Sequence, residues 1–180
     1  EKISDNKKNS KNIIKISKHK RNIEKSQVFF NNKKIFFPAV NYVIGELAKW
    51  PVTAKIKSEL PLGCGFGLSG ASALAATYAL NKLFALKKSK KELAFTAHMA
   101  DVVSLSGLGD VVNQHYGGFL VKYESSSKFK AIKIPIKNKA IYCKYFSRIN
   151  KKEIISKNNK KINKAGIKAL NKIKKLNKKD

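Results

Sequence analysis

The stretch Pro61-Leu62-Gly63-Cys64-Gly65-Phe66-Gly67-Leu68-Ser69-Gly70-Ala71-Ser72 decides how this chain is interpreted. It holds four glycines in eight positions, and glycine leaves the backbone amides bare and able to approach a ligand closely. The small and apolar residues from Ala71 to Leu86 predict a buried helix that starts where the loop ends. Because unpaired amides and the positive end of a helix dipole attract anions, the stretch predicts a phosphate site.

The serines of this loop add a second chemical group to the predicted phosphate site. Ser69 and Ser72 lie where their hydroxyls could contact a phosphate or a magnesium ion. The alternative explanation is a tight connection between a strand and a helix. One glycine would satisfy such a connection, whereas this loop has four.

Two familiar phosphate-binding signatures do not fit the loop. Gly65-x-Gly67-x-x-Gly70 matches the dinucleotide fingerprint, but the preceding segment Val52–Leu60 alternates between apolar and polar residues. The first strand of a dinucleotide-binding unit is a continuous apolar run, and a parallel strand ending in an acid follows its helix. Here a second helix follows instead. A P-loop needs Gly-Lys-Ser/Thr, and Gly70 is followed by Ala71.

The segments around the loop predict an α+β fold. Asn31-Asn32 lies between two short aromatic runs and predicts a hairpin turn, and Ser89-Lys90-Lys91-Glu92 is a capping box that starts a helix. The expected strands are 12–17, 27–31, 33–37, 52–60, 118–123, 128–134 and 140–145. The expected helices are 38–49, 71–86, 89–103 and 160–176, and 110–115 is expected to be a short helix or a turn.

The composition limits the classes of protein to which the chain can belong. A hydrophobic content of 43% supports a packed core, and no run approaches the roughly 20 apolar residues that span a bilayer. The N-terminal segment has no apolar signal-peptide core, and two scattered cysteines do not make a disulfide framework. These features predict a cytoplasmic protein with reduced thiols and no membrane partner.

The net charge of +28 invites a nucleic-acid-binding hypothesis. The excess is nearly all lysine, with Arg21 and Arg148 the only arginines, whereas direct base readout favours arginine. Residues 151–180 carry +10 and residues 61–120 only +2. This distribution favours a compositional bias and a cation-rich surface that attracts anionic substrates over nucleic-acid binding as the main function.

Two aspartates near the loop are candidates for chemistry. Asp101 lies near the end of the predicted helix 89–103, where a negative charge opposes the helix dipole. Asp110 lies in a turn-rich Ser-Gly-Leu-Gly-Asp segment, and capping of the next helix is the structural alternative. Phosphoryl transfer needs a phosphate cradle, a metal and a group that orients or deprotonates the nucleophile. Asp101 as magnesium ligand and Asp110 as base would complete that set.

With the loop and both aspartates located, the chain resembles the GHMP kinases, the family of galactokinase, homoserine kinase, mevalonate kinase and phosphomevalonate kinase. Their second motif has the form Pro-x-Gly/x-Gly-Leu-Gly-Ser-Ser-Ala. Six residues of this sequence match the motif, and Leu68 and Gly70 occupy positions where many members have Ser and Ala. The six are Pro61, Gly63, Gly65, Gly67, Ser69 and Ala71. The wording of the whole loop, of 97–101, of 106–111 and of Gly117-Gly118 is similar to that of the archaeal pantoate kinases.

The resemblance implies a fold, a reaction and a set of site residues. The fold would be a GHMP kinase N-terminal domain, which is ribosomal protein S5 domain 2-like. Ser69 and Asp101 would bind Mg²⁺, with Asp in place of the usual Glu, and Asp110 would be the catalytic residue. The reaction would be ATP plus pantoate giving 4-phosphopantoate and ADP, a step toward coenzyme A; mevalonate, homoserine and shikimate stay open as acceptors. ATP would contact Pro61, Gly63, Gly65, Phe66, Gly67, Leu68, Ser69, Gly70, Ala71 and Ser72.

The resemblance also implies a domain organisation. Residues 1–25 are expected to be a disordered or frayed basic segment, 26–147 a partial ATP-binding domain, and 148–180 the start of a C-terminal α/β domain. The family's first motif has no counterpart before Glu1, and its third would lie beyond Asp180. The chain is therefore expected to be truncated or split, with a homodimer or a complementing C-terminal chain as partner. An inactive or partner-dependent kinase subunit is the non-enzymatic alternative.

Three further residues carry weaker hypotheses. His98 lies on an apolar helix and is interpreted as a packed histidine rather than a catalytic one. His115 follows Asp110 by just over one helical turn, which leaves it as a candidate pocket residue. Cys64 is interpreted as a small filler of the loop, although a thiol near a helix N-terminus can be reactive.

Overall fold

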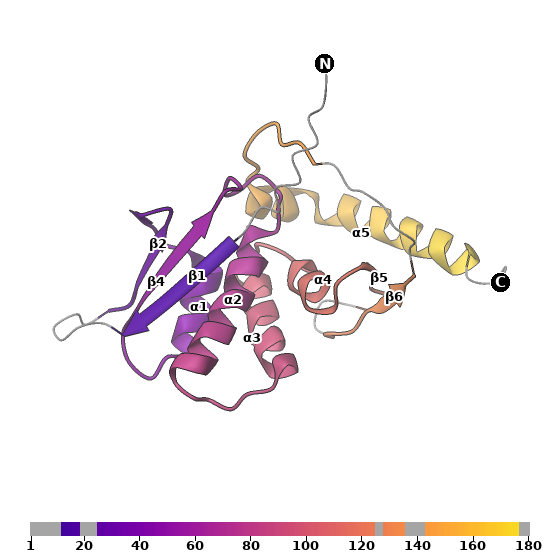
Figure 1. Ribbon diagram of the computed structural model, residues 1–180. Coiled ribbons are helices and arrows are strands. Elements are labelled where there is room, and N and C mark those ends of the chain that lie inside the picture. The colour runs from indigo at the N-terminus through magenta and orange to yellow at the C-terminus, as the bar shows by residue number, and fades with distance from the viewer. Residues whose placement is uncertain (1–11, 19–24, 125–127, 136–142, 177–180) are drawn as a thin grey trace, which may run out of the picture.

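The strand that leads into the glycine-rich loop lies inside a four-stranded sheet of order β1-β4-β2-β3 (Figure 1). The computed structural model describes residues 12–18, 25–124, 128–135 and 143–176. Strand β4 (Val52–Ser58) pairs antiparallel with β1 (Asn12–Lys18) and parallel with β2 (Gln27–Phe30). Every second side chain of β4 is buried, which confirms the alternation that the sequence predicts.

Strand β1 corrects the interpretation of residues 1–25 as frayed. Its pairing with β4 runs from Asn12 opposite Ser58 to Lys18 opposite Val52. Ile14 and Ile16 pack against the core, and this apolar contact holds the strand in the sheet. The interpretation is therefore wrong for 12–18, whereas 1–11 and 19–24 lie outside the described residues.

The predicted Asn-Asn hairpin is confirmed between β2 and β3 (Lys33–Lys34). Asn31 and Asn32 have φ of 47° and 67°, the left-handed values that a two-residue hairpin turn needs. The Asn31 side chain donates to the Ser58 carbonyl at 2.9 Å and accepts from the Ser58 amide at 2.9 Å. The turn therefore fixes the end of β4, the point at which the chain enters the loop.

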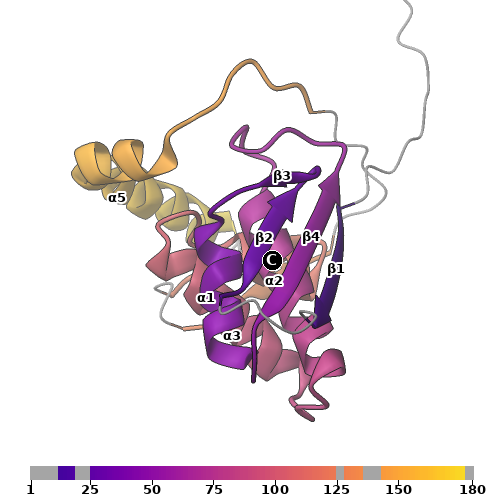
Figure 2. The same cartoon turned by 90° about the vertical axis from the view of Figure 1, so that its left-hand side faces the viewer.

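Three helices cover one face of the sheet (Figure 2). Helix α1 (Pro38–Leu47) connects the parallel strands β2 and β4 and begins with proline at its first position, as predicted. Helices α2 (Leu68–Leu83) and α3 (Lys90–Val103) follow the loop. The capping box of α3 is confirmed, because the Ser89 side chain accepts from the Glu92 amide and Glu92 accepts from the Ser89 amide. The buried core lies between these helices and the sheet.

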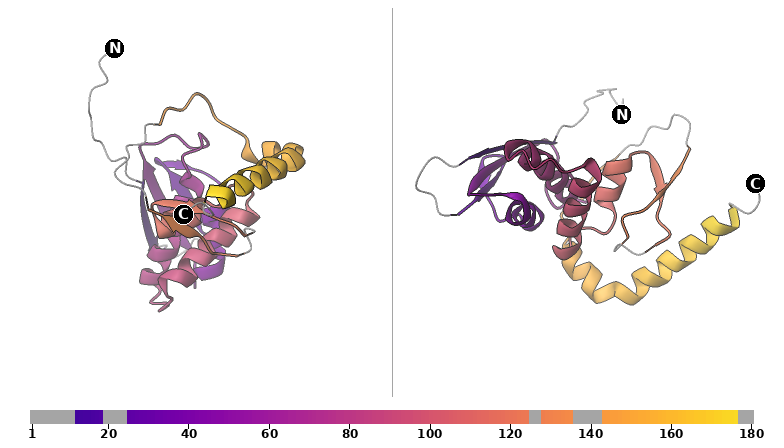
Figure 3. Two further views of the ribbon diagram at one scale, coloured as in Figure 1. Left: turned by 90° about the vertical axis from the view of Figure 1, so that its right-hand side faces the viewer. Right: turned by 90° about the horizontal axis from the view of Figure 1, so that it is seen from below.

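The remaining elements lie beyond the sheet and its helices (Figures 1 and 3). They are α4 (Asp110–Tyr116), a two-stranded sheet of β5 (Phe119–Val121) and β6 (Ile132–Ile134), and α5 (Lys151–Leu176). The expected strand 140–145 is wrong for 143–145, which form no strand, and 140–142 lie outside the described residues. Helix α5 begins nine residues before the expected Lys160 and bends at Asn158.

The observed fold is α+β, as the sequence predicts. Within the described ranges, no helix is both long enough and apolar enough to cross a membrane. The boundary expected between 147 and 148 stays a prediction.

Candidate active site

The glycine-rich loop turns the chain from β4 into α2 through left-handed backbone. Gly63, Gly65 and Gly67 have φ of 83°, 83° and 66°. Gly67 is the N-cap of α2 and has no side chain to bond the first amides. The first helical bond runs from the Ala71 amide to the Gly67 carbonyl at 3.0 Å. Helix α2 therefore begins at Leu68 rather than at the expected Ala71, and the amides of 68–70 precede its first hydrogen bond.

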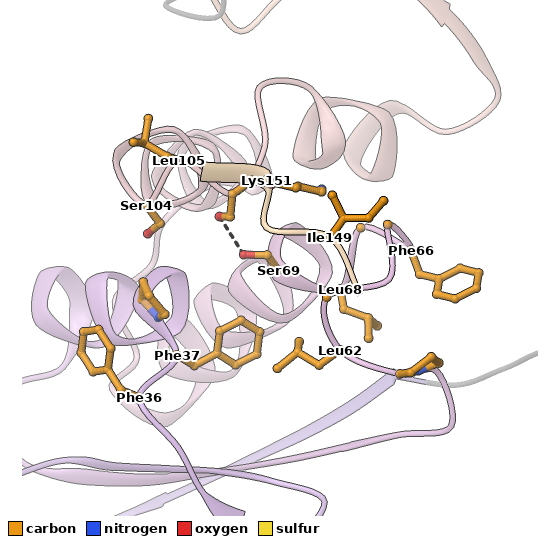
Figure 4. A pocket seen from close by; sticks show the side chains of 16 residues that line it. Phe36, Phe37, Leu62, Phe66, Leu68, Ser69, Ser104, Leu105, Ile149 and Lys151 are labelled. Atoms are coloured by element: carbon orange, nitrogen blue, oxygen red, sulfur yellow. Dashed lines mark hydrogen bonds between the residues drawn. The ribbon is translucent and has the colours of Figure 1, made fainter. Parts of the chain in front are cut away.

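The loop borders a cavity of about 280 Å³ (Figure 4). This volume is near the lower end of small-molecule pockets, which begin at roughly 300 Å³. Other walls come from Phe36, Phe37 and Pro38 at the start of α1, and from 104–106 after α3. Of the ten residues expected to contact ATP, the cavity is lined by Pro61, Gly63, Gly65, Phe66, Gly67, Leu68 and Ser69. Gly70, Ala71 and Ser72 do not line it, so their assignment as ATP contacts stays a prediction.

A chain of hydroxyl groups connects this cavity to Asp101. The Ser69 hydroxyl, in the first turn of α2, donates to the Ser106 hydroxyl at 2.9 Å (dashed line in Figure 4). The Ser106 hydroxyl donates to Asp101 Oδ1 at 2.7 Å. Ser69 and Asp101, the two predicted magnesium ligands, are thus joined through one intervening serine.

Asp101 is a fully buried carboxylate in the last turn of α3. Burial raises its pKa above the ordinary value of 3.8, the hydrogen bond from Ser106 lowers the pKa, and the charge of Asp110 raises it. Its second oxygen, Oδ2, has no hydrogen-bond partner within the described part of the chain. A buried oxygen without a partner is costly, so the structure leaves Asp101 prepared for a further ligand.

Asp110 occupies the first position of α4, and its neighbour Gly109 is the N-cap. No side chain makes a capping hydrogen bond at this end of α4, so capping does not explain Asp110. The Asp110 carboxylate instead accepts from Lys151 Nζ at 3.4 Å. Its charge acts on Asp101, and the two carboxylates therefore share one site.

The donor set fits a magnesium ion. Magnesium is held through one or two carboxylates together with substrate phosphates, and it keeps several waters. The partnerless Oδ2 of Asp101 and the hydroxyl of Ser69 supply such oxygens beside the loop. No group of three or more His, Cys, Asp or Glu gathers among the residues that the structure describes, so a dedicated all-protein metal cage is absent there.

A comparison with protein families covers the loop and both carboxylates. Residues 34–118 match the model of the GHMP kinases N terminal domain, a range that includes the loop, Asp101 and Asp110. The chain carries a GHMP kinase N-terminal domain. The glycine-rich turn into α2 and the two carboxylates beside it are thus features of this domain.

The matches to named relatives cover only part of each relative's length. Pantoate kinase of Methanocaldococcus jannaschii is 33% identical over 153 residues, which cover 81% of this chain and 56% of the relative. Mevalonate kinase of Thermococcus sibiricus is 33% identical over 103 residues, which cover 54% of this chain and 31% of the relative. A solved structure described as a phosphotransferase related to the CoA biosynthesis pathway shares the fold, with a TM-score of 0.58 and 24% identity. That match covers 70% of this chain and 45% of the other. The chain therefore spans about half the length of the pantoate kinase and of the phosphotransferase.

Gly107 leaves room for the two carboxylates of the GHMP kinase domain, because it has no side chain. A Cβ at this position would overlap Asp101 Oδ2 and lie 3.0 Å from Asp110 Oδ2. Both neighbours are carboxylate oxygens, of Asp101 and Asp110, and the added methyl group would displace them.

Gly107→Ala is expected to lower the free energy of unfolding by about 1–3 kcal/mol, because overpacking displaces its neighbours. Urea denaturation monitored by circular dichroism would measure this change. Gly45→Ala on α1 is the matched control, because nothing lies within 4 Å of its added Cβ. Equal effects of the two substitutions would show that Gly107 is not held by close contact with the aspartates.

Lys151 is a site residue that the sequence did not predict. It is the first residue of α5, and it donates to the Ser106 carbonyl at 3.1 Å as well as to Asp110. It also lines the cavity (Figure 4). Its sequence neighbours are lysines and polar residues of a long basic run, so no pattern distinguishes it from them.

The two histidines of the GHMP kinase domain lie outside the cavity lining. His98 is fully buried on α3 with its ring 5.4 Å from that of Phe129, which confirms a packed histidine. His115 packs against Tyr116 and Phe129 and does not line this cavity, which agrees with giving it no site role. Cys64 is half-buried in the loop and lies outside the lining as well.

Proposed function

We propose that this GHMP kinase domain transfers the terminal phosphoryl group of ATP to the hydroxyl of a small hydroxy acid, with pantoate as acceptor and 4-phosphopantoate as product. The observation that carries the proposal is the series of hydrogen bonds from Ser69 through Ser106 to Asp101 Oδ1, because it ends on a carboxylate whose second oxygen, Oδ2, has no partner in the described residues. This series of hydrogen bonds begins at the N-terminus of α2, where an anion is favoured.

The triphosphate of ATP would lie on the loop. The amides of 68–70 precede the first hydrogen bond of α2 and point their donors out of its N-terminus. Left-handed Gly63, Gly65 and Gly67 allow the backbone to curve around the phosphates without side chains in the way. Apolar side chains, among them Phe37 and Leu62, form walls of the cavity beside the loop.

Asp101 and Ser69 would hold the magnesium ion. When bound, the ion neutralises part of the negative charge on the phosphates. A cation beside Asp101 would also favour its charged form, which burial alone disfavours. Asp in place of the longer Glu leaves room for an intervening water.

Asp110 would act as the base. As the acceptor hydroxyl oxygen bonds to the terminal phosphorus, its proton passes to an Asp110 carboxylate oxygen, and the bond from that phosphorus to the bridging oxygen breaks. ADP leaves with the bridging oxygen, and Asp110 later returns the proton to solvent. The position of Asp110 beside Asp101 supports this role, because the base must lie close to the metal-bound phosphate.

Pantoate as the acceptor rests on the wording of the motifs and on the pantoate kinase relative. A mevalonate kinase is 33% identical over 103 residues and a homoserine kinase 32% identical over 130 residues, so mevalonate and homoserine are the alternative acceptors. The chain spans about half the length of the pantoate kinase, so turnover by this chain alone, without a complementing C-terminal chain, is itself part of the proposal.

The test is magnesium-dependent release of ADP from ATP, with pantoate, mevalonate, homoserine and shikimate offered separately. Turnover on pantoate that disappears when magnesium is chelated is the expected result. Turnover on another acceptor would support the kinase activity and overturn the assignment of pantoate as the acceptor. ADP release on none of the four would overturn the proposal for this chain acting alone.

A further inference from the structure

Lys151 places a positive charge between the loop and the base. Its Nζ donates to the Ser106 carbonyl at 3.1 Å and to Asp110 Oδ2 at 3.4 Å. The side chains of Lys151 and Asp110 are 37% and 32% exposed, so the pair is half-buried at the cavity wall. Because an ammonium group has three N–H donors and two are used here, one donor remains for a ligand in the cavity.

Backbone contacts hold Lys151 in this place. Asn150 caps α5, because its side chain accepts from the Glu153 amide at 3.3 Å and its carbonyl accepts from the Ile154 amide at 3.1 Å. One residue earlier, the Ile149 amide donates to the Gly63 carbonyl at 2.9 Å. The start of α5 is therefore attached to the glycine-rich loop itself, at Gly63.

The charge of Lys151 lies in the first turn of α5, where Asp110 is its ion-pair partner. A cation in the first turn of a helix opposes the helix dipole, which favours negative charge there. Among the described residues that line the cavity, Lys151 is also the one charged side chain; the other polar side chains there are the hydroxyls of Ser69, Ser104 and Ser106. Hydroxyl groups do not neutralise a triphosphate, whereas a lysine ammonium group does.

We propose that Lys151 binds the terminal phosphate of the nucleotide and holds it beside Asp110. This inference rests on the proposed function, and it assigns to α5 the cation of the phosphate site. The Lys151 side chain forms no covalent bond with the nucleotide. Its ammonium group keeps its contact with Asp110 while its third N–H donates to a phosphate oxygen. Lys151 therefore holds the terminal phosphate next to the base.

The experiment compares the affinities of the wild-type chain and Lys151→Met for two probes, the magnesium complex of the β,γ-imido analogue of ATP and that of ADP, by isothermal titration calorimetry. Methionine keeps the length of the stem and removes the charge. We expect the triphosphate analogue to bind Lys151→Met about tenfold more weakly, and ADP to bind it with less than a twofold change. Lys151→Arg, which keeps the charge, is expected to retain most of the preference for the triphosphate.

Lys157→Met is the matched control. Lys157 lies on the same helix, its Nζ is 2.6 Å from Glu153 Oε1, and it does not line the cavity. It is expected to bind both probes as the wild type does. Thermal unfolding by circular dichroism checks each variant, and Lys151→Gln replaces Lys151→Met if the latter does not fold. Equal affinities of the wild type and the folded Lys151 variants for the analogue would overturn the inference and leave the kinase proposal standing. A wild-type chain that binds neither probe would overturn both.

Discussion

Replacing Asp110 by asparagine is expected to lower the turnover number of the kinase reaction about a thousandfold, since proton transfer by a positioned side chain contributes about 10²–10⁴. Asparagine has the shape of aspartate, but its neutral amide does not accept the proton of the acceptor hydroxyl. The Lys151–Asp110 contact is half-exposed, and ion pairs of this kind add only about 0–1 kcal/mol to stability. The loss should therefore appear in turnover rather than in folding, and steady-state ADP release with pantoate would measure it.

The control for this substitution is Asn113→Ala, on the same short helix and exposed to solvent. It is expected to leave turnover within a factor of about two, as for surface substitutions away from a site. If Asp110→Asn kept more than a tenth of the wild-type turnover number, Asp110 would not be the base, and the acceptor proton would have to pass to another group.

Asp101→Asn is expected to make the chain more stable and, at the same time, a poorer kinase. The wild-type carboxylate is fully buried and leaves Oδ2 without a hydrogen-bond partner in the described residues. Removing that charge should raise the free energy of unfolding by about 1–2 kcal/mol in the absence of magnesium. Turnover should fall about a hundredfold, because the amide is a weak magnesium ligand.

The pH dependence of stability gives the sign of this effect. Burial raises the pKa of Asp101 above the ordinary 3.8, so the folded chain holds its proton more tightly than the unfolded chain does. The contribution of Asp101 to stability is therefore highest below its pKa in the unfolded chain, and it is lost as the pH rises through its pKa in the folded chain. The advantage of Asp101→Asn should be small below pH 3.8 and complete once the wild-type carboxylate is ionised.

Urea denaturation of both chains across this pH range would measure the difference. Glu46→Gln, which removes an exposed carboxylate on α1, is the control and should change the free energy of unfolding by less than about 0.5 kcal/mol. Added magnesium should stabilise the wild type and leave Asp101→Asn unchanged. A variant that is less stable than the wild type at neutral pH would show that the carboxylate has compensating contacts.

Elements with a local signal were predictable from the sequence. The alternation of β4, the Asn31-Asn32 turn and the capping box of α3 are each encoded by a few neighbouring residues. The start of α2 was not, because its N-cap Gly67 forms no side-chain bond and Leu68 to Gly70 look like loop. The start of α5 was hidden for a similar reason, since lysine and asparagine obscure its apolar stripe before Ile162.

The candidate site was predictable where acids are scarce. Asp101 and Asp110 stand out because residues 61–120 hold only three acids, and one of them, Glu92, is used in a cap. Ser106 and Lys151 had no such signal. They reach Ser69 and Asp110 from 37 and 41 residues away in sequence, and contacts of this range are set by packing rather than by spacing.

The hydrogen bond from the Ile149 amide to the Gly63 carbonyl has a consequence for synthesis of the chain on the ribosome. The fully buried core takes its members from Val28 to Val111, so it is complete long before residue 149 is added. A nascent chain at that earlier stage would have its sheet and helices but would lack Ile149 and Lys151 at the wall of the cavity. Nucleotide binding would therefore mark the emergence of α5, a later event in translation than the folding of the core.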